Sequence, residues 1–230
     1  MNVVTQITEH PRKPGRYIID VDGREFAIVN ADALVDIKVR PGVVIDDVRA
    51  AQLREAGEFV EAYDRALNLL AFRARSSREL HRRLVQKGTS TKRAEQVIAK
   101  LREVGLIDDA DFARQLTRSK LAGGSSRRRV HQELFKRGVS RDVAHAAVDE
   151  VAEDEGLSDE ASIERVARKK WRTLAELDPP TRRRRLYGFL ARRGFDSDDV
   201  SRMVRLLEGE GADAGPTASP SARPPRSATG

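Results

Sequence analysis

Three segments of the chain share one sequence pattern, and each of them ends at a glycine. The segments are RELHRRLVQKG, RRVHQELFKRG and RRLYGFLARRG, ending at Gly88, Gly138 and Gly194. When the glycines are aligned, apolar residues coincide eight and four positions before them, and a basic residue precedes each one. Apolar residues four apart form one face of a helix, and a glycine after the last turn favours a left-handed cap. The pattern predicts tandem helical repeats that bury their apolar faces against their neighbours.

The first copy, from Ser76 to Lys120, shows the expected helices most clearly. Its amphipathic segments are SSRELHRRLVQKG, TKRAEQVIAKLREVG and DDADFARQLTRSK, and glycines separate them. Ser76 and Asp108 suit the N-cap position. A second copy follows the break at Gly123-Gly124, and a third stops after its second helix. We expect a mainly α-helical chain, an elongated and curved array of three tandem three-helix repeats with the third copy truncated.

The start and the end of the chain differ from the repeats. Asp22-Gly23 lies between the β-rich runs RYIIDV and REFAIV, which is a strong signal for a two-residue hairpin. The end is rich in Pro, Ser, Ala and Gly without apolar periodicity, so we expect disorder there. The expected division is an N-terminal β-hairpin module with short helices over 1–57, repeats over 58–122, 123–178 and 179–208, and a disordered tail over 209–230.

Composition excludes several functional classes. The chain has no cysteine, which rules out disulfides and thiolate chemistry, and its four histidines form no HxxxH or HExxH pair. No run of about 18 apolar residues and no secretory pattern occurs, so a cytoplasmic protein without membrane contact is expected. The acidic groups at Asp108–Asp111 and Asp196–Asp199 precede helices, where carboxylates satisfy free amides. We expect no enzyme, no metal and no cofactor.

Basic residues are concentrated in two blocks. Residues 66–122 hold 13 Lys and Arg against 6 Asp and Glu, and residues 165–205 hold 13 against 5. Such clustering indicates a polyanionic or strongly polar partner, although a charge run can also be a solvated face. Trp171, among these cations, could anchor an interface or belong to the core. The candidate contact residues are Arg127, Arg128, Arg129, Arg168, Lys169, Lys170, Arg182, Arg183, Arg184, Arg185, Arg192 and Arg193.

An acidic block opposes these cations. The stretch from Asp142 to Glu164 contains nine acidic residues and no Lys or Arg. That surface would repel phosphate, so a strip that binds only DNA would not be expected to carry it. A protein partner with its own mixed charges tolerates it better.

At these residues the chain resembles the RecX family of bacterial recombinase regulators. The matching pieces are FRARSSRELHRRLVQKG, GLIDDADFARQLTRSK and GGSSRRRVHQELFKRGVSRDVAHAAV, and with the third copy the likeness covers about 66–207. The resemblance implies an all-helical array of three-helix repeats that lodges in the groove of the filament of RecA on single-stranded DNA. It also implies that the protein limits filament extension, ATP hydrolysis, strand exchange and co-protease activity in recombination and the SOS response.

Two other functions stay open on the sequence alone. One is direct binding of nucleic acid by a helical protein of chromatin or transcription type. The other is a helical-repeat scaffold for an unrelated protein. The strength of the effect on RecA, its sign, the oligomeric state and the role of the N-terminal module do not follow from the sequence.

Overall fold

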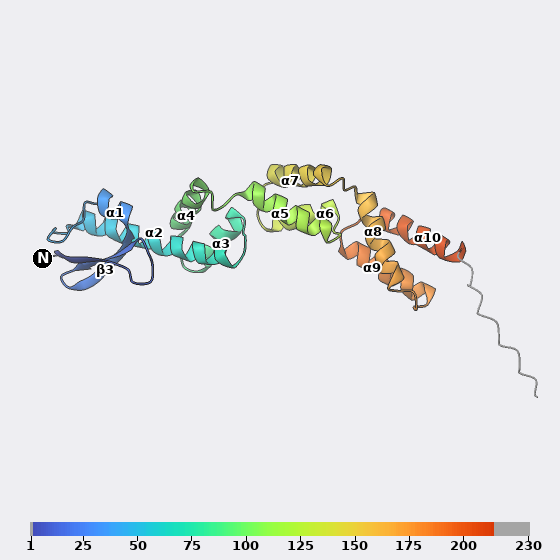
Figure 1. Cartoon of the computed structure of the whole chain (residues 1–230), viewed down its shortest axis with the longest axis horizontal. Helices are drawn as coiled ribbons and strands as arrows, with labels where there is room; N and C mark the ends of the chain where they lie inside the picture. Colours follow the sequence, from blue (N-terminus) through green and yellow to red (C-terminus); the bar gives the residue numbers. More distant parts are fainter. Residues whose placement is uncertain (1, 214–230) are drawn as a thin grey trace, which may run out of the picture. The chain divides into compact units, whose positions relative to one another are not determined.

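The computed structural model describes residues 2–213, with side chains through residue 210. These residues form three strands and ten helices (Figure 1). The strands are β1 (Val4–Glu9), β2 (Arg16–Val21) and β3 (Arg24–Asn30). The helices are α1 (Ala31–Asp36), α2 (Asp47–Phe72), α3 (Ser77–Gln86), α4 (Thr91–Glu103), α5 (Asp109–Ala122), α6 (Arg127–Lys136), α7 (Arg141–Asp154), α8 (Asp159–Arg172), α9 (Pro179–Arg192) and α10 (Ser197–Asp213). The mainly helical fold and the N-terminal β-module are therefore confirmed.

The chain divides into two compact units. The first contains residues 1–115 and 134–144, and the second contains residues 116–133 and 145–230. The division passes through α5, α6 and α7, so the middle helices contribute to both units. Most of the expected disordered tail, from residue 214 onward, lies outside the described residues, whereas residues 209–213 are the end of α10.

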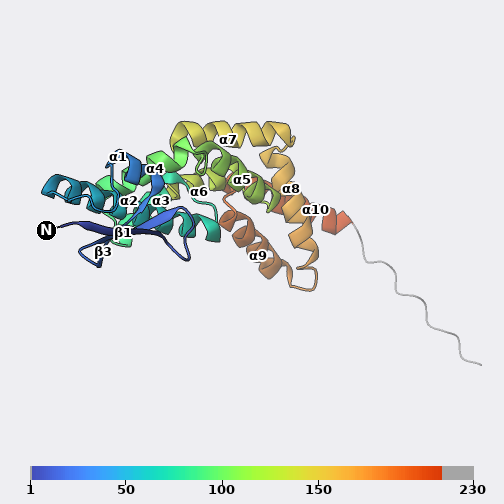
Figure 2. The same ribbon diagram turned by 60° about the vertical axis from the view of Figure 1, so that its left-hand side comes forward.

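The N-terminal module is an antiparallel sheet of order β1-β2-β3 that packs on α2 (Figures 1 and 2). Asp22 and Gly23 connect β2 to β3 with φ angles of 50° and 75°, the left-handed pair that a two-residue hairpin requires. Ile19 and Val29 of the sheet share a core with Leu53 of α2. A small sheet is marginal by itself, and burial against α2 gives it a hydrophobic core.

The first unit contains a three-helix group built from the end of α2 with α3 and α4. Its core joins Ala66 of α2, Leu80 and Leu84 of α3, and Val97 and Leu101 of α4. Helix α2 continues from the N-terminal module into this group without a break. The expected repeat over 58–122 contains these three helices and α5 as well, and α5 is absent from this core.

The second unit contains a corresponding group of α8, α9 and α10. Ile163 of α8, Leu186 and Leu190 of α9, and Val200 and Leu207 of α10 belong to one buried cluster. The expected division placed α8 in the second repeat and left the third with two helices. In the structure, α8 packs on α9 and α10 and completes a three-helix group.

The aligned glycines end α3, α6 and α9 in the left-handed conformation. Gly88, Gly138 and Gly194 have φ angles of 89°, 81° and 89°. Space for a side chain differs among them: a Cβ at Gly88 would meet nothing within 4 Å, whereas at Gly138 it would meet Arg78, and at Gly194 it would meet Arg129. The latter two glycines are therefore also sites of close packing.

Candidate partner-binding surface

The N-terminus of α3 forms a polar joint with two segments that follow it in the chain. The Ser76 hydroxyl accepts a hydrogen bond from the Glu79 amide at 3.1 Å and donates one to the carbonyl oxygen of Arg137. The Ser77 amide donates to Asp109 at the start of α5, at 2.7 Å. We call this cluster the first joint. Asp109 of α5 and the Ser76 hydroxyl satisfy two free amides of α3, and the turn after α6 accepts a hydrogen bond from that hydroxyl.

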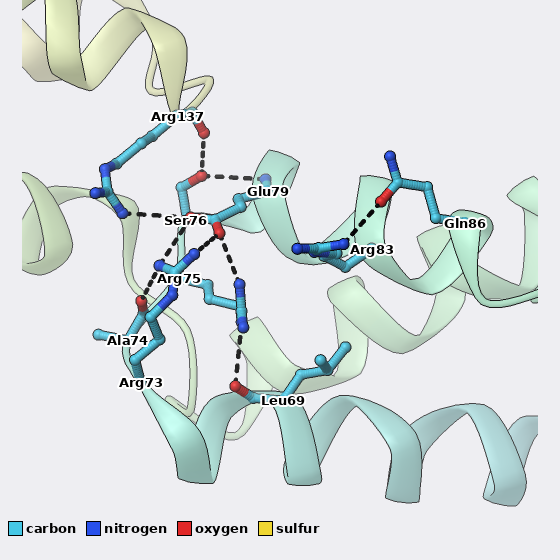
Figure 3. Close-up of polar contacts among 9 residues, drawn as sticks. All are labelled: Leu69, Arg73, Ala74, Arg75, Ser76, Glu79, Arg83, Gln86 and Arg137. Carbon is cyan, nitrogen blue, oxygen red and sulfur yellow. Dashed lines mark hydrogen bonds and ion pairs between the residues drawn. The ribbon is translucent and has the colours of Figure 1, made fainter.

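Glu79 is the centre of the first joint (Figure 3). Its carboxylate accepts hydrogen bonds from Arg73 and Arg75, and Arg137 lies 3.6 Å away. Arg75 also donates to the carbonyl oxygen of Leu69 at 3.1 Å. Burial acts to raise the pKa of Glu79, but the hydrogen bonds and charges of Arg73 and Arg75 outweigh it and hold that pKa below its usual value. These arginines are engaged in holding the fold.

The N-terminus of α6 repeats part of this arrangement, and we call it the second joint. The Ser126 amide donates to the carbonyl oxygen of Arg193 at 3.0 Å, and the Arg127 amide donates to Asp159 at 3.2 Å. Alignment by the glycines places Arg129 at the position of Glu79. The second joint therefore lacks the central carboxylate of the first.

Backbone carbonyl groups accept from the arginines of the second joint. Arg127 donates to the carbonyl oxygen of Leu157 at 2.6 Å. Arg128 donates to those of Gly194 and Phe195 at 3.1 and 3.2 Å. Arg193 donates to the carbonyl oxygen of Gly123, and its guanidinium lies 4.5 Å from the ring centroid of Phe189. Three of the twelve candidate cations thus hold helix ends together.

The candidates on α8 are also largely engaged within the chain. Arg168 forms a bidentate pair with Glu210, at 2.6 and 2.8 Å, and donates to Glu164 at 2.8 Å. These hydrogen bonds raise the pKa of Arg168. The Lys170 ammonium lies 5.6 Å from the ring centroid of Phe189. Lys169 is exposed and has no side-chain partner within the described residues.

The run of four arginines on α9 separates into two kinds. Arg182 stacks on the Trp171 ring, with its Cζ 3.6 Å from the centroid, and donates to the Trp171 carbonyl oxygen at 3.0 Å. Burial lowers the pKa of Arg182. Arg183 donates to Glu208 at 2.8 Å. Arg184 and Arg185 are exposed, with no side-chain partner among the described residues.

Five of the twelve candidates therefore have no hydrogen-bond or ion-pair partner for their side chains within residues 2–210: Arg129, Lys169, Arg184, Arg185 and Arg192. The position of Arg184 within its repeat explains why its side chain has no such partner. Arg78 and Arg128 occupy equivalent positions of α3 and α6 and pack on the glycine turns that follow α6 and α9. Arg184 has the same position on α9, after which no further repeat follows in the described chain. Alignment by the glycines could have identified Arg184 as free.

Trp171 is half-buried and packs against the core of α8, α9 and α10. The cation that stacks on the Trp171 ring is Arg182, which belongs to the same unit. The aromatic ring therefore takes part in packing, and the cation on it is internal.

The acidic residues that precede helices act as caps. Asp108 accepts from the amides of Ala110 and Asp111 at 2.7 and 3.0 Å, and these bonds lower its pKa. Asp196 accepts from the Asp198 amide at 3.0 Å. Among the described residues, no group of three or more His, Asp or Glu side chains is placed to hold a metal ion. None of the helices described in residues 2–213 combines the length and hydropathy needed to cross a bilayer.

The comparisons with known proteins agree with this division into helices. Models of the first, second and third three-helix domains of RecX match residues 62–101, 108–148 and 158–204. The first runs from the end of α2 through α4, the second from α5 into α7, and the third from α8 into α10. Each family domain therefore spans three helices.

Curated relatives carry the name "Regulatory protein RecX". One from Mycobacterium avium is 41% identical over 139 residues, covering 60% of this chain and 79% of that protein. One from Amycolatopsis mediterranei is 36% identical and covers 63% of this chain and 82% of that protein. One from Levilactobacillus brevis is 27% identical but extends over 90% of this chain and 77% of that protein.

Solved structures share the fold. A crystal structure of regulatory protein RecX superposes with a TM-score of 0.68 at 22% identity, covering 89% of this chain and 99% of that chain. RecX from Lactobacillus salivarius superposes with a TM-score of 0.52 at 18% identity, covering 66% of this chain and 97% of that chain. With the three matching domains and the relatives above 30% identity, these results establish that the chain belongs to the RecX family.

Proposed function

We propose that this chain is a non-enzymatic, cytoplasmic regulator that binds the RecA filament on single-stranded DNA and lowers its ATPase, strand-exchange and co-protease activities. The observation that supports the proposal most strongly is the match to all three RecX three-helix domains. Relatives named as regulatory proteins support a regulatory role. The recombinase supplies the chemistry, and this chain supplies a binding surface.

The free cations are the proposed contact residues. Within the twelve candidates, the side chains of Arg129, Lys169, Arg184, Arg185 and Arg192 have no hydrogen-bond or ion-pair partner among the described residues, so binding a partner would break no such bond. The other seven would have to leave carbonyl groups, carboxylates or aromatic rings. Because an exposed and unpaired cation gains most from an anionic partner, we assign the main contribution to these five.

The test measures ATP hydrolysis by RecA on single-stranded DNA while this protein is titrated in. Inhibition by the native chain is expected, together with loss of inhibition by the variant Arg184→Glu/Arg185→Glu/Arg192→Glu. Reversal of the whole run 182–185 would be less informative, because Arg182 and Arg183 hold α9 in place. Unchanged hydrolysis at saturating native protein would contradict the proposal.

A matched control separates a local surface from net charge. Arg82, Lys87 and Lys92 are exposed cations of α3, the following turn and α4, without side-chain partners among the described residues. The variant Arg82→Glu/Lys87→Glu/Lys92→Glu changes the net charge by the same amount. We expect it to inhibit as the native chain does, whereas equal loss in both variants would show that only total charge matters.

A further inference from the structure

The solvent-facing side of α9 collects three exposed arginines that have no hydrogen-bond or ion-pair partner among the side chains that the structure describes. At about 100° per residue, Arg184, Arg185 and Arg192 project within an arc of about 100°. Leu186 and Leu190, which are fully buried, project to the opposite side of the helix. Gly188 and Ala191 lie within or beside the same arc. We call the set Arg184, Arg185, Gly188, Ala191 and Arg192 the α9 outer face.

No carboxylate of this segment neutralises the α9 outer face. Residues 179–195 contain six arginines and no Asp or Glu. Outside the segment, Glu208 accepts from Arg183, and Asp178 accepts from the Thr181 amide at 3.0 Å. The hydrogen bonds from Thr181 lower the pKa of Asp178, and the charge of Arg184 also contributes to that shift. The charges of the three arginines are therefore balanced only in part, through the electrostatic interaction of Arg184 with Asp178, and the remaining positive charge favours a ligand with several negative charges.

Gly188 is unusual because nothing in the fold requires it. Glycine is unfavourable inside a helix relative to alanine. A Cβ at Gly188 would meet only the end of the flexible Arg192 side chain, at 3.2 Å, so close packing does not explain the residue. The Arg192 guanidinium lies over Gly188, so the middle of the face carries a cation above small residues, Gly188 and Ala191. A negatively charged extended chain would meet that cation there.

The spacing of the arginines suits a polymer of phosphates. Arg184 and Arg192 are eight residues apart, so their Cα atoms are separated by about 12 Å along the helix axis. One flexible strand can place separate phosphates at the two ends of such a face. Tyr187, partly exposed and one turn after Arg184, offers a ring on which an unpaired base can stack.

We propose that the α9 outer face binds the phosphodiester backbone of single-stranded nucleic acid. This inference rests on the proposed function, in which the bound strand is the single-stranded DNA inside the filament. The binding step itself does not depend on the recombinase. Failure of the strand to bind and failure to regulate RecA can therefore be told apart in separate assays.

The experiment measures fluorescence anisotropy of the full chain with a labelled oligothymidylate of about 30 nucleotides, across salt concentrations. The native chain should bind, and Arg184→Gln/Arg185→Gln/Arg192→Gln should bind at least about tenfold more weakly. Affinity falls with salt, and each phosphate contact to a single strand contributes about 0.7 to the steepness of log affinity against log salt. Loss of three such contacts should make the slope of this triple variant shallower by about 2. The variant Arg82→Gln/Lys87→Gln/Lys92→Gln should keep the native slope.

A second pair of variants leaves every arginine in place. Gly188→Asp puts a carboxylate in the middle of the face, and Gly188→Asn is its neutral match. We expect weaker binding for the first and near-native binding for the second, with equal far-UV circular dichroism. Equal affinities for the two, or native affinity in the triple Gln variant, would overturn the proposal. Tighter binding of a duplex or of polyglutamate than of the oligothymidylate would overturn the assignment to a single strand.

Discussion

Neutralising Glu79 should destabilise the first unit strongly. The carboxylate is 7% exposed and is shared by the guanidinium groups of Arg73, Arg75 and Arg137, which are 41%, 7% and 28% exposed. The variant Glu79→Gln leaves Arg75 buried without its counter-charge. Removing one partner of a buried pair costs about 3–5 kcal/mol. Because Arg73 and Arg137 can be hydrated, we expect a loss near the lower end, about 3 kcal/mol.

The assay can separate the two units. The only tryptophan of the chain, Trp171, belongs to the second unit, so its fluorescence follows unfolding there, whereas circular dichroism follows helices of both units. Unfolding in urea by circular dichroism should show a transition shifted down by about 2 M in Glu79→Gln, for a slope of about 1.5 kcal/mol per M. The fluorescence transition should stay in place.

The stabilisation that Glu79 provides should depend on pH in one direction. The pKa of Glu79 is lowered in the folded protein, so its contribution is present above the ordinary pKa of a glutamate and is lost as the pH falls through the lowered value. The difference in unfolding free energy between the native chain and Glu79→Gln should therefore be full at pH 7 and shrink in acid. A shift below about 0.5 M at pH 7, or a difference that does not depend on pH, would refute this reasoning.

Three further predictions concern other parts of the fold. Gly88 and Gly194 have the same φ of 89°, but only at Gly194 would an added Cβ meet a neighbouring atom, at 2.6 Å. Gly88→Ala should therefore lower the free energy of unfolding by about 1–2 kcal/mol, and Gly194→Ala should lower it clearly more, as measured by thermal unfolding. Asp64→Asn should loosen the N-terminal sheet from α2, because Asp64 pairs with Arg16 at 2.7 Å, and hydrogen exchange of β2 should accelerate while that of α9 does not. Leu190→Ala should cost about 2–5 kcal/mol in the fluorescence transition, since Leu190 is fully buried; a loss below 1 kcal/mol would argue against the assigned core.

Local signals in the sequence predicted much of the fold. Asp22-Gly23 marks the hairpin, Ser76 caps α3, and Gly88 ends that helix, because each of these choices depends on residues within a few positions of one another. The glycine alignment located α3, α6 and α9, which were expected as the first helices of the copies and are the second helices of the matched family domains. These features are determined by backbone geometry and capping, which a sequence shows directly.

The grouping of helices was not readable in the same way. Helix α2 is 26 residues long and serves both the sheet and the first three-helix group, so its sequence gives no boundary where one role ends. The assignment of α8 depends on contacts of Ile163 with α9 and α10, which join residues more than 20 positions apart. Periodicity identifies a buried face but does not name the helix that covers it.

The sequence also did not show which arginines have partners within the fold. Arg182 and Arg184 are neighbours in one run, yet the first stacks on Trp171 and the second is unpaired. Arg128 finds its acceptors at Gly194 and Phe195, far along the chain. Carbonyl groups at helix ends also accept hydrogen bonds from arginine, and a sequence does not show which of them are available.

We propose that this member of the RecX family binds an assembled recombinase filament. Sedimentation of the chain with RecA filaments, formed on single-stranded DNA with a slowly hydrolysed ATP analogue, tests it most directly. We expect the native chain to pellet with the filaments and to stay in the supernatant with RecA that lacks DNA and nucleotide. If the chain remained in the supernatant at saturating filament concentration, it would not be a filament-binding protein.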